Sequence, residues 1–100
     1  MIKPGIKLGL KDWQPRLDKS QTKYCEVWFN VNITEDYSPM FNYLKASGIH
    51  TGLHFWGILP DSTEPNLAYP GPTLKPSLDL VQTTIDIAAN YGFTYVNVHV

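Results

Sequence analysis

Four short segments of this 100-residue chain alternate between apolar side chains and polar, small or aromatic ones. Such alternation with a period of two predicts β-strands whose two faces differ. The fold must therefore bury the apolar face of each strand and also accommodate the polar and aromatic side chains of the mixed face. The predicted strands are Ile6–Leu10, Tyr24–Val31, His50–Trp56 and Thr94–Val100.

Two amphipathic helices are predicted between the last three strands. The first begins at Ser38, a good N-cap that precedes a proline, and ends before Gly48. The second begins at Ser77 and closes at Gly92. Between the first two strands, a short helix around Arg16–Ser20 and a plain loop are both compatible with the sequence. The apolar residues predicted to form the buried face of the second helix are Leu78, Val81, Ile85 and Ala88.

Helices that connect successive strands imply right-handed parallel crossovers, so the expected fold class is α/β. Parallel sheets buried on both faces usually show continuous apolar runs rather than alternation. A barrel explains the alternation, because its apolar parity packs on outer helices and its mixed parity lines the interior. A (β/α)8 barrel needs about 250 residues. Residues 1–100 are therefore expected to form one partial domain, the N-terminal half of a TIM barrel truncated at its fourth strand. A longer chain or a second copy would complete it.

Charge and cysteine content limit the classes of partner. The net charge is −1 and the basic residues are scattered, so nucleic acid and anionic membranes are not expected partners. A lone cysteine, Cys25, excludes an internal disulfide and fits a reducing compartment. No apolar run has the length of a signal peptide or of a membrane helix. These features predict a cytoplasmic protein that works without a membrane.

Two histidines lie near the carboxyl ends of the last two predicted strands. His54 and His99 share the mixed parity, and neighbouring strands are about 5 Å apart, so their rings could share a metal or a substrate. The alternative is that both are interior residues held by hydrogen bonds. On the same reasoning, the mouth of the barrel is expected to receive the side chains of Lys11, Asn30 and Trp56.

The same parity also carries a carboxylate in the middle of the second strand. Glu26 needs a partner if it is buried, and Lys7 on the adjacent strand has the matching parity. An interior ion pair is the preferred interpretation, and a general base is the alternative. His50 begins its strand, at the end far from the mouth, and is expected to be structural. Cys25 falls on the opposite, apolar parity and is expected to be an inert core thiol.

Several short pieces follow one another in an order and spacing that cover nearly the whole chain. They are Glu26-Val-Trp-Phe, Gly52-Leu-His54-Phe-Trp, Pro65-Asn66-Leu-Ala68, a helix that starts at Ser77 and contains Ile85 and Ala88-Ala89, Tyr91-Gly92, and Tyr95-Val-Asn-Val-His99. In this order and spacing they resemble the xylose isomerase-like TIM barrels. That superfamily contains sugar and sugar-phosphate isomerases and epimerases together with endonuclease IV-type DNA repair enzymes.

The resemblance implies different roles for the histidines in its two branches. In the nuclease branch, the positions of His54 and His99 hold metal ligands. In the isomerase branch, these positions more often touch substrate, and Glu, Asp and His residues of later strands hold the metal. The nuclease branch usually has an aromatic residue where this chain has Gly57, and a first-strand histidine where it reads Gly9-Leu-Lys11. These departures favour the isomerase branch.

The sequence thus predicts the N-terminal half of a sugar or sugar-phosphate isomerase or epimerase that moves protons through an enediol(ate). A divalent metal (Mn, Mg, Co or Zn) would be ligated mostly by residues outside this chain. The alternatives are an endonuclease IV-type abasic-site nuclease and a non-catalytic half-barrel that self-associates. No catalytic residue is assigned. The predicted substrate-binding residues are His54, Trp56, Asn30, His99 and Lys11, of which His99 and His54 are also candidate metal ligands.

Overall fold

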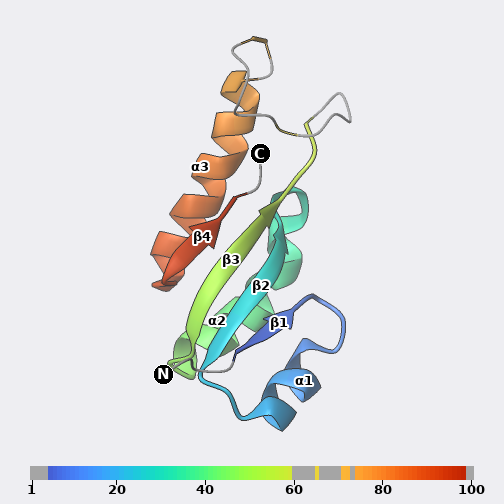
Figure 1. Ribbon diagram of the computed structural model, residues 1–100, viewed down its shortest axis with the longest axis vertical. Coiled ribbons are helices and arrows are strands. Elements are labelled where there is room, and N and C mark those ends of the chain that lie inside the picture. Colours follow the sequence, from blue (N-terminus) through green and yellow to red (C-terminus); the bar gives the residue numbers. More distant parts are fainter. Residues whose placement is uncertain (1–4, 60–64, 66–70, 73, 99–100) are drawn as a thin grey trace.

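The computed structural model describes residues 5–59, 65, 71–72 and 74–98, in which four parallel strands form one sheet (Figure 1). The strands lie side by side in chain order, and helical segments connect them. This confirms the expected α/β fold class and is consistent with half of a β/α barrel. The strands are β1 (Ile6–Leu8), β2 (Tyr24–Asn30), β3 (His50–Trp56) and β4 (Tyr95–Asn97). The helices are α1 (Trp13–Ser20), η1 (Val31–Tyr37), α2 (Ser38–Ala46) and α3 (Leu74–Tyr91).

Some element bounds differ from those expected. β1 ends at Leu8 rather than Leu10, which leaves Lys11 in the turn that follows. A helix, α1, does form between β1 and β2. A 3-10 helix, η1, precedes α2 and was not expected. It is held at its start by the Asn30 side chain, whose Oδ1 accepts a hydrogen bond from the Asn32 backbone N–H at 2.9 Å. Because Asn30 caps this turn, the polypeptide leaves β2 directly into helical structure.

Glycines end the two longer helices, as predicted. Gly48 and Gly92 have φ values of 65° and 71°, a left-handed conformation that glycine adopts without steric cost. The residue after Gly92, Phe93, donates its N–H to the Ala88 carbonyl at 2.8 Å. This reversal directs the chain from α3 into β4. Within the described residues, no helix is both long and apolar enough to cross a membrane.

The buried face of α3 is only partly the one predicted, because Val81 and Ala88 pack on the core but Leu78 and Ile85 do not. Leu78 and Ile85 are 48% and 43% exposed, whereas Ser77 and Thr84 are fully buried and Ala88 is buried as expected. Small residues let the helix lie close to the sheet. The buried Thr84 hydroxyl donates a hydrogen bond of 3.0 Å to the Leu80 carbonyl. α3 carries apolar residues on more than one side, so periodicity alone included two exposed residues, Leu78 and Ile85, in the predicted buried face. The helix also begins at Leu74, three residues before Ser77.

The apolar parity of the strands packs against the helices, as expected. Figure 1 shows α2 behind β2 and β3, with α1 near β1 and α3 beside β4. Phe41 of α2 is 1% exposed and sits at the centre of an aromatic cluster. Its ring centroid lies 5.1–5.5 Å from those of four others: Phe29, Tyr37, Tyr91 and Phe93. One side chain therefore ties β2, η1 and α2 to the end of α3.

The mixed parity forms the opposite face of the sheet. Trp28, Trp56 and Tyr95 are 46%, 36% and 48% exposed there. His54 lies on the same face but is only 6% exposed, because neighbouring side chains cover it. The described structure thus leaves a polar and aromatic sheet face open, and this face carries the candidate site.

Candidate functional site

The strand register places the polar side chains of the open face in rows across the sheet. In the first row, Lys7 pairs with Glu26, Glu26 with Gly52 and Gly52 with Tyr95. In the next row toward the carboxyl ends, Trp28 pairs with His54 and His54 with Asn97. The first row therefore aligns residues from all four strands across this face.

Glu26 is the hub of these rows. Its Oε1 lies 3.0 Å from His54 Nδ1 and 3.4 Å from Lys7 Nζ. Its Oε2 accepts a hydrogen bond of 2.7 Å from the Tyr95 hydroxyl. The ion pair with Lys7 confirms the partner expected for this carboxylate. Only 15% of the Glu26 side chain is exposed, so these contacts replace most of its hydration.

The partners keep Glu26 ionised. Burial by itself would raise its pKa, but hydrogen bonds from its three partners and the nearby lysine charge outweigh burial and hold the pKa below its usual value. Burial, the hydrogen bond to Glu26 and the carboxylate charge raise the pKa of Tyr95 to about 12. Tyr95 is therefore a protonated donor, and Glu26 is a charged acceptor, at neutral pH.

This charge state fixes the chemistry of His54. An ionised carboxylate only accepts hydrogen bonds, so Nδ1 of His54 must carry the proton between them. When the ring is neutral, its lone pair is then on Nε2. Trp28 stacks on the ring with centroids 4.4 Å apart and an interplanar angle of 17°. The carboxylate and the indole together set the tautomer and the orientation of His54.

Replacing Glu26 with glutamine is expected to lower the free energy of unfolding by about 1–2 kcal/mol at neutral pH. A carboxyl whose folded-state pKa is lowered stabilises the fold above its ordinary pKa of 4.5, and this contribution is lost as the pH falls through the lowered value. The difference between wild type and variant should therefore shrink as the pH falls below 4.5. Urea unfolding across this range measures it, with the same change at the exposed Glu35 as the control. A difference that does not depend on pH would contradict the assignment.

The sequence-predicted mouth residues are placed as follows. Asn30 and Trp56 are in register at the carboxyl ends of β2 and β3. Lys11 is exposed in the turn after β1, not on the strand. His99 lies outside the described residues. The structure thus brings two predicted residues together beside His54, and it moves Lys11 off the barrel lining because β1 is shorter than expected.

The start of η1 and the segment that follows β3 are hydrogen-bonded to each other. Both side-chain groups of Asn32 bond the backbone of Ile58: Oδ1 accepts from its N–H at 2.7 Å, and Nδ2 donates to its carbonyl at 3.0 Å. Gly57, directly after β3, packs against the start of η1, and a Cβ added to it would stand 2.7 Å from Val31 Cγ1. No side chain fits at Gly57 without moving its neighbours. The segments that follow β2 and β3 therefore hold each other in place next to the site.

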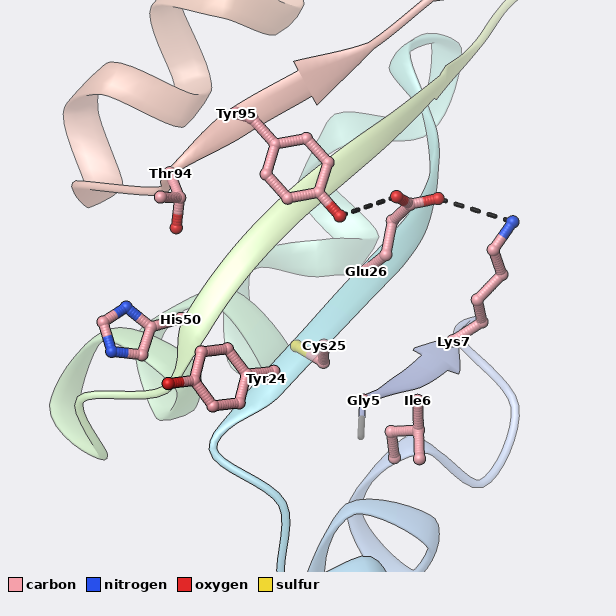
Figure 2. Close-up of a pocket in the computed structure, with 9 residues that line it drawn as sticks. All are labelled: Gly5, Ile6, Lys7, Tyr24, Cys25, Glu26, His50, Thr94 and Tyr95. Carbon is pink, nitrogen blue, oxygen red and sulfur yellow. Dashed lines mark hydrogen bonds and ion pairs between the residues drawn. The ribbon is translucent and has the colours of Figure 1, made fainter. Parts of the chain in front are cut away.

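A pocket of about 390 Å³ opens on the same face, but at the amino ends of the strands (Figure 2). Tyr24 and His50 stack there with centroids 5.0 Å apart, which agrees with a structural role for His50. Cys25 also borders the pocket, and burial raises the pKa of its thiol, so it stays protonated. Lys7, Glu26 and Tyr95 also line this pocket, so it adjoins the Glu26 contacts on the side away from the carboxyl ends of the strands.

A metal site is not complete in the part of the chain that the structure describes. No group of three or more histidine, cysteine, aspartate or glutamate side chains is close enough there to hold an ion. His54 is the one predicted ligand within the described residues, and its Nδ1 is bonded to Glu26. These residues alone do not fit a divalent cation, so any such ion needs ligands from elsewhere.

Sequence reasoning missed two parts of the site. The contact of Glu26 with His54 was not predicted, because the carboxylate had been assigned to Lys7 alone. Tyr95 was placed on the correct face but given no role. Its signal was a glycine: Gly52 lies between Glu26 and Tyr95 in the register and leaves the space for the tyrosine ring.

Comparison with known proteins gives one informative similarity. No family model matches the chain, and no solved structure matches it. The chain is 37% identical over 75 residues to a protein of Haloarcula marismortui named probable endonuclease 4. The match covers 74% of this chain and 26% of that protein, so the chain spans about a quarter of its relative's length. This agrees with the resemblance to the xylose isomerase-like barrels at the level of the superfamily. The relative's name also weakens the expectation that nucleic acid is no partner.

Proposed function

We propose that this chain is the N-terminal half of a β/α-barrel enzyme that isomerises or epimerises a sugar or a sugar phosphate. The observation that carries the proposal is the fixed imidazole of His54 on the open face, flanked by Trp28 and Asn97. An imidazole whose tautomer is set by a carboxylate can exchange a hydrogen bond or a proton with a hydroxyl. Neighbouring indole and amide groups suit a polyhydroxylated substrate, with Trp56 and Asn30 nearer the carboxyl edge.

Two features support a barrel that continues beyond β4. The open face carries an ion-paired row that resembles an interior layer, with three aromatic side chains exposed on it. On the other side, Leu78 and Ile85 leave an apolar stripe exposed on α3. Ile85 also borders a groove of about 360 Å³ beside β4. Another strand and helix added at this edge would cover the stripe and the groove, and closure of the barrel would cover the open face.

Among the described residues, the candidate site residues have distinct roles in this proposed chemistry. Glu26 accepts the hydrogen bond from Nδ1 of His54 and so determines which ring nitrogen is the donor. Asn97 and Asn30 orient substrate hydroxyls by hydrogen bonds. A divalent cation, which would polarise the carbonyl when bound, takes most of its ligands from outside this chain, with His54 and His99 as the candidates within it.

An abasic-site nuclease is the second candidate. Its support is the name of the Haloarcula marismortui relative. Against it stands Gly57, where the nuclease branch usually has an aromatic residue: a Cβ there would stand 2.7 Å from Val31 and 3.3 Å from Asn32 Oδ1. The first strand also leads to Lys11, an exposed turn residue, rather than to a strand histidine. These positions favour the isomerase over the nuclease.

Turnover assays on the complete protein separate these functions. The protein is supplied in turn with Mn, Mg, Co and Zn, and offered a panel of sugars and sugar phosphates and a DNA duplex with an abasic site. We expect an isomerised or epimerised sugar, loss of turnover with chelator, and intact DNA. Cleavage of the duplex without sugar turnover would select the nuclease. Failure of both reactions, with self-association in light scattering, would favour a non-catalytic half-barrel.

A further inference from the structure

Tyr95 reaches over an intervening strand to contact Glu26. It begins β4, whereas Glu26 lies on β2, and β3 runs between them. Figure 2 shows the Tyr95 ring lying across β3 with its hydroxyl directed at the carboxylate. The hydrogen bond is 2.7 Å long, the shortest of the three contacts to this carboxylate.

Gly52 makes this reach possible. It is the β3 residue in register with both partners. A Cβ added to Gly52 would overlap the ring of Tyr95. The backbone φ of Gly52 does not lie in the left-handed region, so the absent side chain is required for space and not for conformation. Glycine in a strand often marks such a close approach.

The other donors do not fix Glu26 as firmly. Lys7 is 64% exposed along its side chain and lies 3.4 Å from Oε1, so it contributes little beyond a screened charge. His54 is the group whose position depends on Glu26. Without Tyr95, Oε2 would lose its only donor among the described residues, and the carboxylate could rotate away from Nδ1.

We propose that Tyr95 is a positioning residue: it lies over Gly52, anchors Oε2 of Glu26, and through Glu26 fixes the tautomer and orientation of His54. The structural part of this inference stands on the geometry alone, and its consequence for turnover rests on the function proposed above. Tyr95 does not need to touch substrate for this role. The alternative is that its hydroxyl only adds stability.

The tautomer of His54 can be read directly. In the complete protein labelled with ¹⁵N-histidine, the shifts of Nδ1 and Nε2 distinguish a protonated nitrogen from one with a lone pair. We expect the Nδ1–H form in the wild type and its loss or mixing in Tyr95→Phe, Gly52→Ala and Glu26→Gln. Tyr95→Phe removes one oxygen atom and keeps the ring, so its fold should be retained. Gly52→Ala should also break the contact between Tyr95 and Glu26, because the added methyl group displaces the tyrosine ring.

Matched controls exist for both changes. Tyr43→Phe removes another tyrosine–carboxylate hydrogen bond, of 2.9 Å to Asp18, at a distance from the open face. Gly9→Ala adds a methyl group where no atom lies within 4 Å. Both controls should keep the wild-type tautomer. An unchanged His54 tautomer in both Tyr95→Phe and Gly52→Ala would overturn the inference.

Kinetics then separate positioning from stability. Tyr95→Phe should lower kcat about 10–100-fold with a smaller change in KM, and the controls should not. An altered tautomer with unchanged kcat would overturn the positioning role. If the complete protein turns over no sugar, the proposed function fails, while the NMR result still decides whether Tyr95 fixes His54.

Discussion

Replacement of His54 with alanine is expected to lower kcat/KM for the proposed sugar reaction by about 10²–10⁴-fold, the usual contribution of a positioned proton donor or acceptor. His54 is 6% exposed, hydrogen-bonded through Nδ1 and stacked on Trp28, so its loss removes the one fixed imidazole at the described mouth. Steady-state kinetics on the complete protein measure the effect.

The chain supplies its own control for this prediction. His50 lies on the same strand and the same face, but at the amino end, where it stacks on Tyr24. His50→Ala should leave kcat/KM within a few-fold of the wild type. Equal losses in both variants would mean that the effect comes from general damage to β3. No loss in His54→Ala would remove His54 from the site.

Replacement of Phe41 with alanine is expected to lower the free energy of unfolding by about 3–5 kcal/mol. Phe41 is 1% exposed, and its ring contacts aromatic residues from β2, η1 and the end of α3. Truncation would leave a cavity that these rings cannot readily fill, because they belong to different elements. Denaturant unfolding of the complete protein measures the loss.

A nearby exposed apolar residue tests whether burial is the cause. Ile33 of η1 is 41% exposed, and Ile33→Ala should cost no more than about 0.5 kcal/mol. Phe41→Leu, which refills part of the space, should fall between the two. A cost for Phe41→Ala close to that of Ile33→Ala would show that the aromatic cluster does not join the helices to the sheet.

The sheet was predictable because period-two alternation and glycine stops are local signals. β3 has the bounds expected, and Gly48 and Gly92 end their helices in the left-handed conformation. Parity alone placed Glu26 and Lys7 on one face, and the register then brings them to 3.4 Å. The alternation and the glycine stops depend on residues a few positions apart, so they can be recognised in the sequence alone.

The missed features depend on how elements meet. The buried face of α3 follows Ser77 and Thr84 because small residues allow a close approach, which a count of apolar residues does not detect. The contact from Tyr95 to Glu26 joins residues 69 positions apart and depends on the absence of a side chain at Gly52. The register that creates this contact could not be derived from local patterns.

The most direct test of the central claim, that the open face is the inside of a barrel, is oxidative footprinting of the tryptophans in the complete protein. Trp28 is 46% exposed on this face in the described chain, and Trp13, on α1, is a reference on the helical side. We predict that Trp28 is oxidised much more slowly than Trp13, because the remaining strands close over it. Oxidation of Trp28 as fast as that of Trp13 would contradict the barrel and the site built on it.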